Sequence, residues 1–263
     1  MTTDVTLRGF VPSVAAAARE VPKDAMPTAV FKTLGDQASS LRTRRGQTIG
    51  LTLDGGEAAF FVRAGVLILR VAMPALPRHI VMLLFAGDVL TSGFVPPACD
   101  ADLTAASTGE IWRLRHAALR ELTRREGPLG AYVEKAIARK TAWQTIHATA
   151  LAQFDCEQRV ATFLVEVALR TGLPAAAGGV TTEMPLSRKE IADYLGLNAD
   201  TLSRVMARLR GAGVLTQSER SRILIRDFRA LASRSPASRA VMATHPDSCK
   251  RLALAAEVLD AQS

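Results

Sequence analysis

Short apolar runs separated by turn residues fill the chain between about Leu41 and His116. The runs QTIGLTL, AAFFVRAGVLILRVA, RHIVMLLF and GEIWRLRH are rich in Val, Ile, Leu and Phe, with Gly, Pro and Asp between them. Gly65 suits a tight hairpin, and Gly87 followed by Asp88 marks another turn. Regularly spaced short strands of this kind predict an antiparallel sandwich or barrel.

From about Ala117 to Leu151 the apolar residues recur instead every three to four positions, which predicts a long helix. Such an apolar stripe packs within its own chain or pairs with a second copy in a coiled coil, and the pattern alone leaves both open. A further helix, DCEQRVATFLVEVALRTG, is expected to begin at a cap from Asp155 and to end at Gly172.

The segment LSRKEIADYLGLNADTLSRVMARLRGAGVL predicts two helices on either side of a tight corner. Ser187 and Glu190 form a capping box for the first helix, Gly196 permits the turn, and Asn198 caps the second helix. This is a helix-turn-helix. The alternating TQSERSRILIRD that follows predicts a two-stranded hairpin, or wing, with residues 218–221 near its tip.

The second helix of this pair has two faces. Its core face is expected to hold Leu202, Val205, Met206 and Leu209, and its opposite face Asp200, Ser203, Arg204, Ala207 and Arg208. The first turns of such a helix reach base edges in a major groove, where Arg204 can bind guanine O6 and N7 and Asp200 can accept from a cytosine amine. A solvated helix face of mixed charge has the same pattern, so the surroundings must decide.

Positive charge gathers around this segment. Residues 186–230 hold nine Lys or Arg against five acids, a net of +4, which is half of the chain's +8. A basic region favours an anionic partner, and Arg220 and Arg222 at the wing tip would lie on DNA phosphates. The predicted DNA-binding residues are Asp200, Ser203, Arg204, Asn198, Thr201, Arg208, Ser187, Arg188, Arg220 and Arg222.

QRVATFLVEVALR and the IADYLGL-x4-LSR core of the helix-turn-helix resemble the Crp/Fnr superfamily of bacterial transcription regulators, over roughly residues 35–232. In that family a Glu-x-x-Ser-Arg or Glu-x-x-Gly-Arg pattern reads the operator, and the matching positions here are Asp200, Ser203 and Arg204. The serine resembles the FixK and Fnr branch, whose half-sites are TTGAT-like. Asp200 is one methylene shorter than the usual Glu, which bears on its reach to cytosine.

The resemblance implies an α+β protein with a cyclic-nucleotide-binding-like β-roll, a long dimerisation helix and a C-terminal winged helix-turn-helix. The expected segments are a weakly patterned arm at 1–34, the β-roll at 35–127, the dimerisation helix at 128–153, the DNA-binding domain at 154–232 and a tail at 233–263. A homodimer would hold two winged helices about one DNA turn apart on a pseudo-palindromic operator. The residues expected to pair are Leu129, Tyr132, Val133, Ala136, Trp143 and Ile146. RNA polymerase is a further implied partner.

The cyclic-nucleotide signature of the family does not fit this chain. In the nucleotide binders a Gly-Glu pair and an Arg-Ser or Arg-Thr pair hold the ribose and the phosphate. The corresponding region, TSGFVPPACDADLTAASTGEIWRLRH, lacks that order, and its Gly109-Glu110 pair comes too late. A β-roll that responds to another effector, or to none, is expected.

Metal and haem cofactors are not expected either. Three cysteines, Cys99, Cys156 and Cys249, are too few and too scattered for a four-thiolate iron-sulfur cluster. A lone His is usually solvated or hydrogen-bonded, which argues against haem ligation at the lone His79, His116 and His147. Cys156, at the start of a predicted helix, is a candidate redox-sensitive thiol, although such a Cys is more often a small packed residue.

The pattern contains no catalytic motif of the GxSxG, P-loop or HExxH kind, so no enzyme is predicted. Scattered cysteines, the absence of a signal peptide and the absence of a long apolar run predict a cytoplasmic protein without a membrane partner. The alternative function is a β-roll that docks a protein or binds an effector, with vestigial DNA binding. Salt-sensitive, sequence-specific DNA binding discriminates the two.

Overall fold

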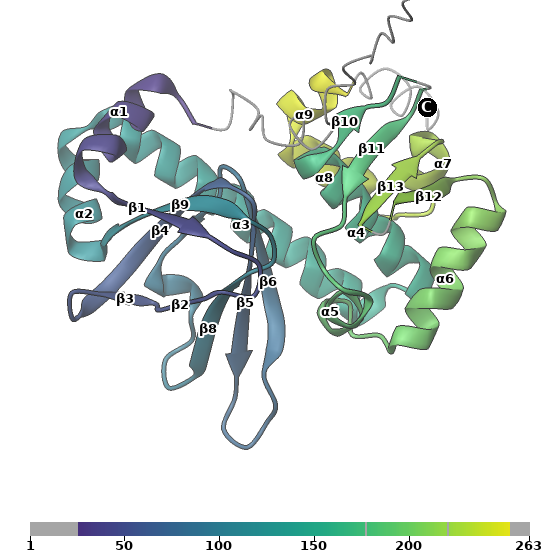
Figure 1. Cartoon of the computed structure of the whole chain (residues 1–263), viewed down its shortest axis with the longest axis horizontal. Coiled ribbons are helices and arrows are strands. Elements are labelled where there is room, and N and C mark those ends of the chain that lie inside the picture. The colour runs from purple at the N-terminus through teal and green to yellow at the C-terminus, as the bar shows by residue number, and fades with distance from the viewer. Residues whose placement is uncertain (1–25, 177, 220, 253–263) are drawn as a thin grey trace, which may run out of the picture.

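The computed structural model describes residues 26–176, 178–219 and 221–252, and it has two parts joined by a long helix (Figure 1). The first part holds all the strands up to residue 115. They are β1 (Ser39–Thr43), β2 (Thr48–Ile49), β3 (Thr52–Leu53), β4 (Gly56–Ala64), β5 (Val66–Ala72), β6 (His79–Phe85), β7 (Val89–Leu90), β8 (Asp100–Ala105) and β9 (Gly109–Arg115), with a 3-10 turn at Ser92–Phe94.

These strands form two antiparallel sheets with a shared apolar core, as the alternation of apolar runs and turns predicts. One sheet has the order β1-β9-β4-β3 with β7 beside β4, and the other has the order β2-β8-β5-β6. Phe60, Val62, Leu67 and Leu103 pack between them. Gly65 has φ +86° in the β4–β5 turn, where a Cβ would come within 2.9 Å of a carbonyl oxygen, so only glycine fits this turn. Strand β8, DADLTA, was not predicted, because this segment has few apolar residues.

Three helices cover the outer face of the β4–β9 sheet: α1 (Thr28–Gln37), α2 (His116–Arg125) and α3 (Gly127–Gln153). Val30 and Leu34 of α1 are buried there, so residues 28–34 pack with the β-roll and are not part of a loose arm. Residues 1–25 of the predicted arm lie outside the described part of the chain. The predicted helix 117–151 is two helices, α2 and α3, which meet at Glu126.

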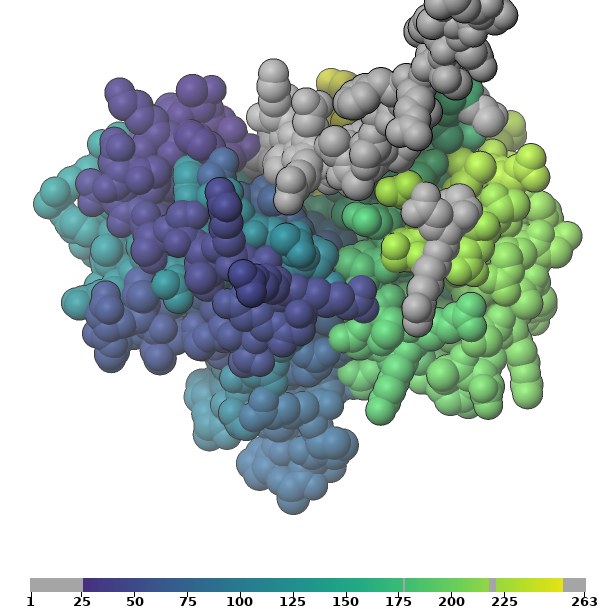
Figure 2. Space-filling model, in the orientation of Figure 1, coloured from purple at the N-terminus to yellow at the C-terminus, as the bar shows by residue number. Residues whose placement is uncertain are grey.

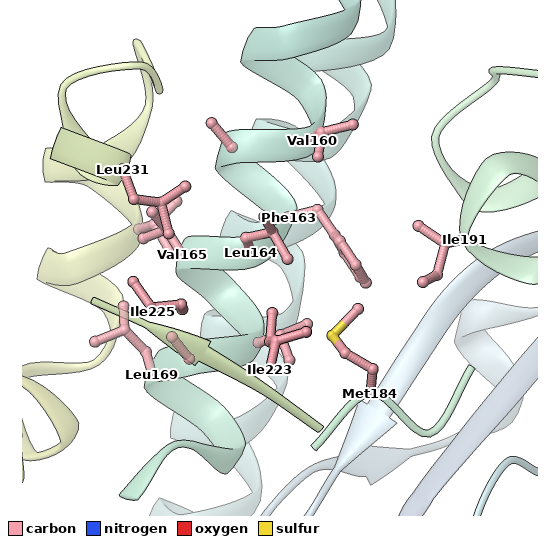
Figure 3. Close-up of a cluster of buried hydrophobic side chains, with 14 of the residues drawn as sticks. Val160, Phe163, Leu164, Val165, Leu169, Met184, Ile191, Ile223, Ile225 and Leu231 are labelled. Atoms are coloured by element: carbon pink, nitrogen blue, oxygen red, sulfur yellow. The ribbon is translucent and has the colours of Figure 1, made fainter. Parts of the chain in front are cut away.

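The second part is a helical domain with a small sheet of the order β10-β11-β13-β12. The predicted wing is confirmed as β12 and β13, and the connection before the helix-turn-helix forms a second hairpin, β10–β11. Figure 3 shows the core of this domain around α4. Its elements are α4 (Cys156–Thr171), β10 (Leu173–Pro174), β11 (Val180–Glu183), α5 (Arg188–Tyr194), α6 (Ala199–Gly211), β12 (Leu215–Glu219), β13 (Arg222–Ile225), α7 (Phe228–Ala232), α8 (Ser238–Thr244) and α9 (Pro246–Arg251).

The segment after residue 232 packs on α4 as far as residue 252. His245 Nε2 lies 2.9 Å from Glu166 Oε2 in a buried pair, and Arg251 donates to the carbonyl oxygens of Leu169 and Gly172 at the end of α4. These contacts make α8 and α9 part of the same helical domain as α4, so the predicted tail begins too early. Residues 253–263 lie outside the described part of the chain. No described helix is both long and apolar enough to cross a bilayer.

Candidate DNA-binding site

The corner between α5 and α6 is fixed by local hydrogen bonds that the sequence predicts. Ser187 Oγ accepts from the amide of Glu190 at 3.2 Å, and Glu190 Oε2 accepts from the amide of Ser187 at 2.8 Å. Asn198 Oδ1 accepts from the amide of Thr201 at 2.7 Å and so caps α6. Gly196 takes φ +61° between the two helices. The predicted helix-turn-helix and its two helix caps are therefore confirmed.

Helix α6 presents its predicted reading face to solvent. Leu202, Val205 and Leu209 are at most 2% exposed and hold the helix on the domain core. On the opposite side Asp200, Arg204, Ala207 and Arg208 are exposed and Ser203 is half-buried. Within the described part of the chain, neither Arg204 nor Asp200 makes an ion pair. Their charged groups are therefore available to a ligand in the first turns of α6.

The other predicted contact residues surround this face. Arg188 is exposed at the start of α5, and Arg222 begins β13 of the wing. Arg208 lies 3.5 Å from Glu157 of α4, so its guanidinium is shared with an acid of its own domain. Arg220, the other predicted wing contact, lies outside the described residues.

The first helix of the pair is anchored to the β-roll by three polar contacts that the sequence did not predict. Arg70 Nη2 of β5 donates to Glu190 Oε1 at 3.0 Å. His79 Nδ1 lies 2.8 Å from Asp193 Oδ1, and the other oxygen of Asp193 accepts from the amide of Ile80 at 3.0 Å. Figure 2 shows the purple and blue surface of the β-roll adjoining the green surface of the second part of the molecule. We call these contacts the α5 anchor.

A buried aspartate ties α3 and α4 to the β-roll. Asp88, fully buried in the β6–β7 turn, lies 2.6 Å from Lys140 Nζ, 2.7 Å from Arg170 and 3.2 Å from Arg139. Burial by itself would raise the pKa of the Asp88 carboxyl, but the three cations outweigh it and hold that pKa well below its usual range. The predicted Gly87-Asp88 turn therefore supplies the buried carboxylate that holds α3 against the β-roll.

A stack of rings joins α3 to α5. Trp143 Nε1 donates to Tyr194 Oη at 2.9 Å, and the His147 ring lies on the Tyr194 ring with centroids 4.0 Å apart. Burial, with a smaller contribution from the charge of His79, lowers the pKa of His147 to about 4. His147 is therefore a neutral packing residue at neutral pH.

The residues predicted to pair between two copies lie mainly in the chain's own cores. Leu129, Val133 and Ala136 pack against α1 and the β-roll, and Trp143 packs against α4 and α5, each at most 8% exposed. Tyr132 and Ile146 are half-buried against the same clusters. This stripe thus packs within one chain, which is the alternative that the sequence pattern leaves open.

Some of the His and Cys side chains considered for cofactor binding contact other side chains of the same chain. His116 Nδ1 lies 3.6 Å from Glu57, Cys99 Sγ lies 3.3 Å from Met73 Sδ, and burial raises the pKa of the Cys249 thiol. Cys156 is half-buried in the first turn of α4. The described residues contain no cluster of three or more His, Cys, Asp or Glu that could hold a metal ion.

One sequence signal for the missed contacts was present. Lys140 sits in the apolar stripe of α3, between Ala136 and Trp143, where a charge needs a buried partner. The α5 anchor gave no such signal, because Arg70 lies 120 residues from its partner Glu190 and each side chain resembles an ordinary exposed charge in the sequence.

Comparison with known proteins places this geometry in a family. A model of the Crp-like helix-turn-helix domain matches residues 158–234. A probable transcriptional activator of Rhizobium leguminosarum bv. viciae is 30% identical over 195 residues, which are 72% of this chain and 79% of the relative. The nitrogen fixation regulation protein FixK of Rhizobium meliloti is 40% identical over 79 residues, 30% of this chain and 31% of FixK.

The fold matches as well. The structure of FixK2 from Bradyrhizobium japonicum aligns with a TM-score of 0.62 at 22% identity, over 75% of this chain and 97% of that one. The β-roll, the long helix α3 and the C-terminal helix-turn-helix therefore follow the architecture of Crp-type proteins. This chain belongs to the Crp/Fnr family, whose members are DNA-binding transcription regulators and not enzymes.

Proposed function

We propose that this regulator binds a pseudo-palindromic promoter operator with TTGAT-like half-sites as a homodimer. The observation that carries the proposal is the exposed N-terminal face of α6, where Asp200 and Arg204 have no ion-pair partner among the described residues. A helix entering the major groove uses this part to reach base edges. Arg204 then binds guanine and Asp200 accepts from cytosine, while the small Ser203 permits close approach.

Phosphate contacts would position the helix without reading sequence. Their donors surround α6, because two capped helix ends and the wing lie beside it. The proposed phosphate contacts are Ser187, Arg188, Asn198, Thr201, Arg208, Arg220 and Arg222. Neutralising several phosphates makes binding strongly dependent on salt.

The dimer would form along the exposed face of α3. Ala131, Ala138, Thr145 and Ala152 are seven residues apart, and all are exposed on this 27-residue helix. A repeat of seven is the spacing at which two helices pack along one seam. We call these four positions the α3 seam. The seam supports pairing of two copies by the face of α3 that their own cores leave uncovered.

Contact with RNA polymerase and residence in the cytoplasm belong to the same proposal. Both rest on the family resemblance, since a regulator of this kind acts on chromosomal promoters. The alternative in which the β-roll docks a protein and DNA binding is vestigial predicts no salt-sensitive preference for any sequence.

The test replaces Arg204 by Ala and measures fluorescence anisotropy of a labelled TTGAT-type palindrome and of a scrambled duplex. Arg204→Ala is expected to lose roughly 1 to 3 kcal/mol on the palindrome and little on the scrambled DNA, because it removes a base contact. Arg239→Ala, an exposed arginine on α8, is the control and should leave binding unchanged. Wild-type affinity of Arg204→Ala for the palindrome would contradict the assignment.

A further inference from the structure

A cavity of about 690 Å³ lies in the DNA-binding domain between α4, α5, α6 and the small sheet. Its wall is apolar, and Figure 3 shows Phe163, Met184 and Ile191 facing a common space from three different elements. The apolar residues that line it are Val160, Phe163, Leu164, Met184, Leu186, Ile191, Leu202, Met206 and Ile223. Natural ligand sites occupy roughly 300 to 1,000 Å³ and are lined mainly by apolar side chains, so both the size and the lining suit a small molecule.

The charged groups that line this cavity are all positive. Arg188 of α5 and Arg210 of α6 reach it from the DNA-binding domain, and Arg45 reaches it from the β1–β2 turn of the β-roll. None of the three makes an ion pair with a described residue. In the described part of the chain no acidic residue lines the cavity. Three uncompensated guanidinium groups beside an apolar chamber complement a ligand that is apolar at one end and anionic at the other.

We propose that this cavity binds a small amphipathic carboxylate, with its apolar body among Phe163, Ile191 and Met206 and its carboxylate between the arginines. Arginine is suited to the head group because its planar guanidinium donates two parallel hydrogen bonds to a carboxylate. Burial of the apolar body supplies most of the affinity, and the arginines select the sign of the head group.

The location of the cavity connects its occupant to both parts of the molecule. Arg45 belongs to the β-roll, whereas Arg188 stands among the proposed phosphate contacts. An anion held by Arg188 therefore competes with DNA phosphates, and it also holds the β-roll against α5. The effect on DNA rests on the proposed function; the binding itself does not.

The experiment titrates the full-length protein with decanoate in a calorimeter, without DNA, and repeats the titration with decylamine and with decanol. Decanoate is expected to bind at one site per chain, and the amine and the alcohol are expected to bind at least about tenfold more weakly. Arg45→Glu should weaken decanoate binding about tenfold, because it places a negative charge beside the carboxylate. Arg44→Glu is the matched control, since Arg44 is exposed next to Arg45 and does not line the cavity.

A second variant tests the apolar end. Met206→Trp fills part of the chamber and should also weaken decanoate, provided that its thermal unfolding shows a folded protein. Equal binding of decanoate, decylamine and decanol, no binding of decanoate, or equal effects of Arg45→Glu and Arg44→Glu would each overturn the proposal. Because these titrations contain no DNA, a negative result in them leaves the operator-binding proposal intact. Wild-type DNA affinity of Arg204→Ala would likewise leave the proposed carboxylate binding intact.

Discussion

Asp200 and Arg204 are the side chains that we propose contact bases, and Asp88 is the residue that ties α3 and α4 to the β-roll. Asp200 stands where the resemblance expects Glu, so in the proposed complex its carboxylate would lie one methylene further from the base. Arg204, by contrast, keeps the reach that a bidentate contact to guanine requires. The guanine of each half-site is therefore the position on which we expect discrimination to be strongest.

Asp88 is the residue whose loss we expect to cost the most stability. Asp88→Asn would leave Lys140, Arg139 and Arg170 facing one another without the buried anion that compensates them. Removing one member of a buried charged group costs roughly 3 to 5 kcal/mol. Urea unfolding at neutral pH measures this loss. Asp100→Asn, which breaks an ion pair with Arg78 at the exposed surface, should cost far less, because water screens that pair. Equal effects of the two substitutions would show that the Asp88 group is not structural.

His147 makes stability depend on pH. Its pKa is about 4 in the folded protein against an ordinary value of 6.5, so the unfolded chain takes up the proton first as the pH falls. Stability is therefore complete above about pH 6.5 and is lost on the way down to pH 4, by roughly 2 kcal/mol between pH 7 and pH 5 from this group alone. His147→Phe keeps an aromatic ring against Tyr194 and removes the part of the pH-dependent stability loss that comes from His147. Identical losses in the wild type and His147→Phe, measured by urea unfolding at both pH values, would contradict the buried neutral ring.

At the scale of elements, α3 uses its apolar stripe inside the chain and leaves the α3 seam exposed. The sequence pattern predicted helical structure here but not the break at Glu126. It could not say which face meets which partner, because three-to-four periodicity is the same for a stripe packed on its own domain and one packed on a second copy. Helix α1 and the strands of the β-roll cover the part of this stripe that holds Leu129, Val133 and Ala136. Only the fold, which brings these distant segments together, resolves that ambiguity.

The α3 seam is tested by adding charge to it. Ala138→Glu places two carboxylates at one seam position of a symmetric pair, where like charges and the larger side chain oppose close packing. Sedimentation velocity should show the wild type as a dimer and Ala138→Glu as a monomer with an unchanged far-ultraviolet spectrum. Ala118→Glu, at an exposed alanine of α2, is the control and should remain a dimer. A dimeric Ala138→Glu would place the pairing elsewhere.

Elements with strong local signals were predicted well. The capping box of α5, the Asn198 cap, the Gly196 corner, the two faces of α6 and the wing all follow from residues within a few positions of one another. Strand β8 and the hairpin β10–β11 were missed because their sequences are short and polar or small, and their stability comes from pairing with β5 and β13. The α8 and α9 helices were missed for the same reason, since their order depends on contacts with α4.

For the whole molecule, the two parts are coupled by more than the chain that joins them. The α5 anchor, the Asp88 group and the ring stack on Tyr194 all connect the β-roll or α3 to α4 and α5. The β-roll is thereby hydrogen-bonded directly to α5, the helix that packs against α6. None of these long-range contacts was predictable from local sequence pattern, whereas the buried and exposed faces of α6 were, and the fold class followed from the family resemblance.

The proposed function requires that two copies of α6 read an inverted repeat through Arg204 and Asp200. The most direct measurement is selection from a random DNA library by the wild-type protein, with Arg204→Ala selected in parallel. The wild type is expected to return an inverted repeat with half-site centres about one helical turn apart and a guanine fixed in each half-site, and Arg204→Ala to lose preference at that guanine. A motif without two-fold symmetry, or an identical motif from Arg204→Ala, would contradict the account.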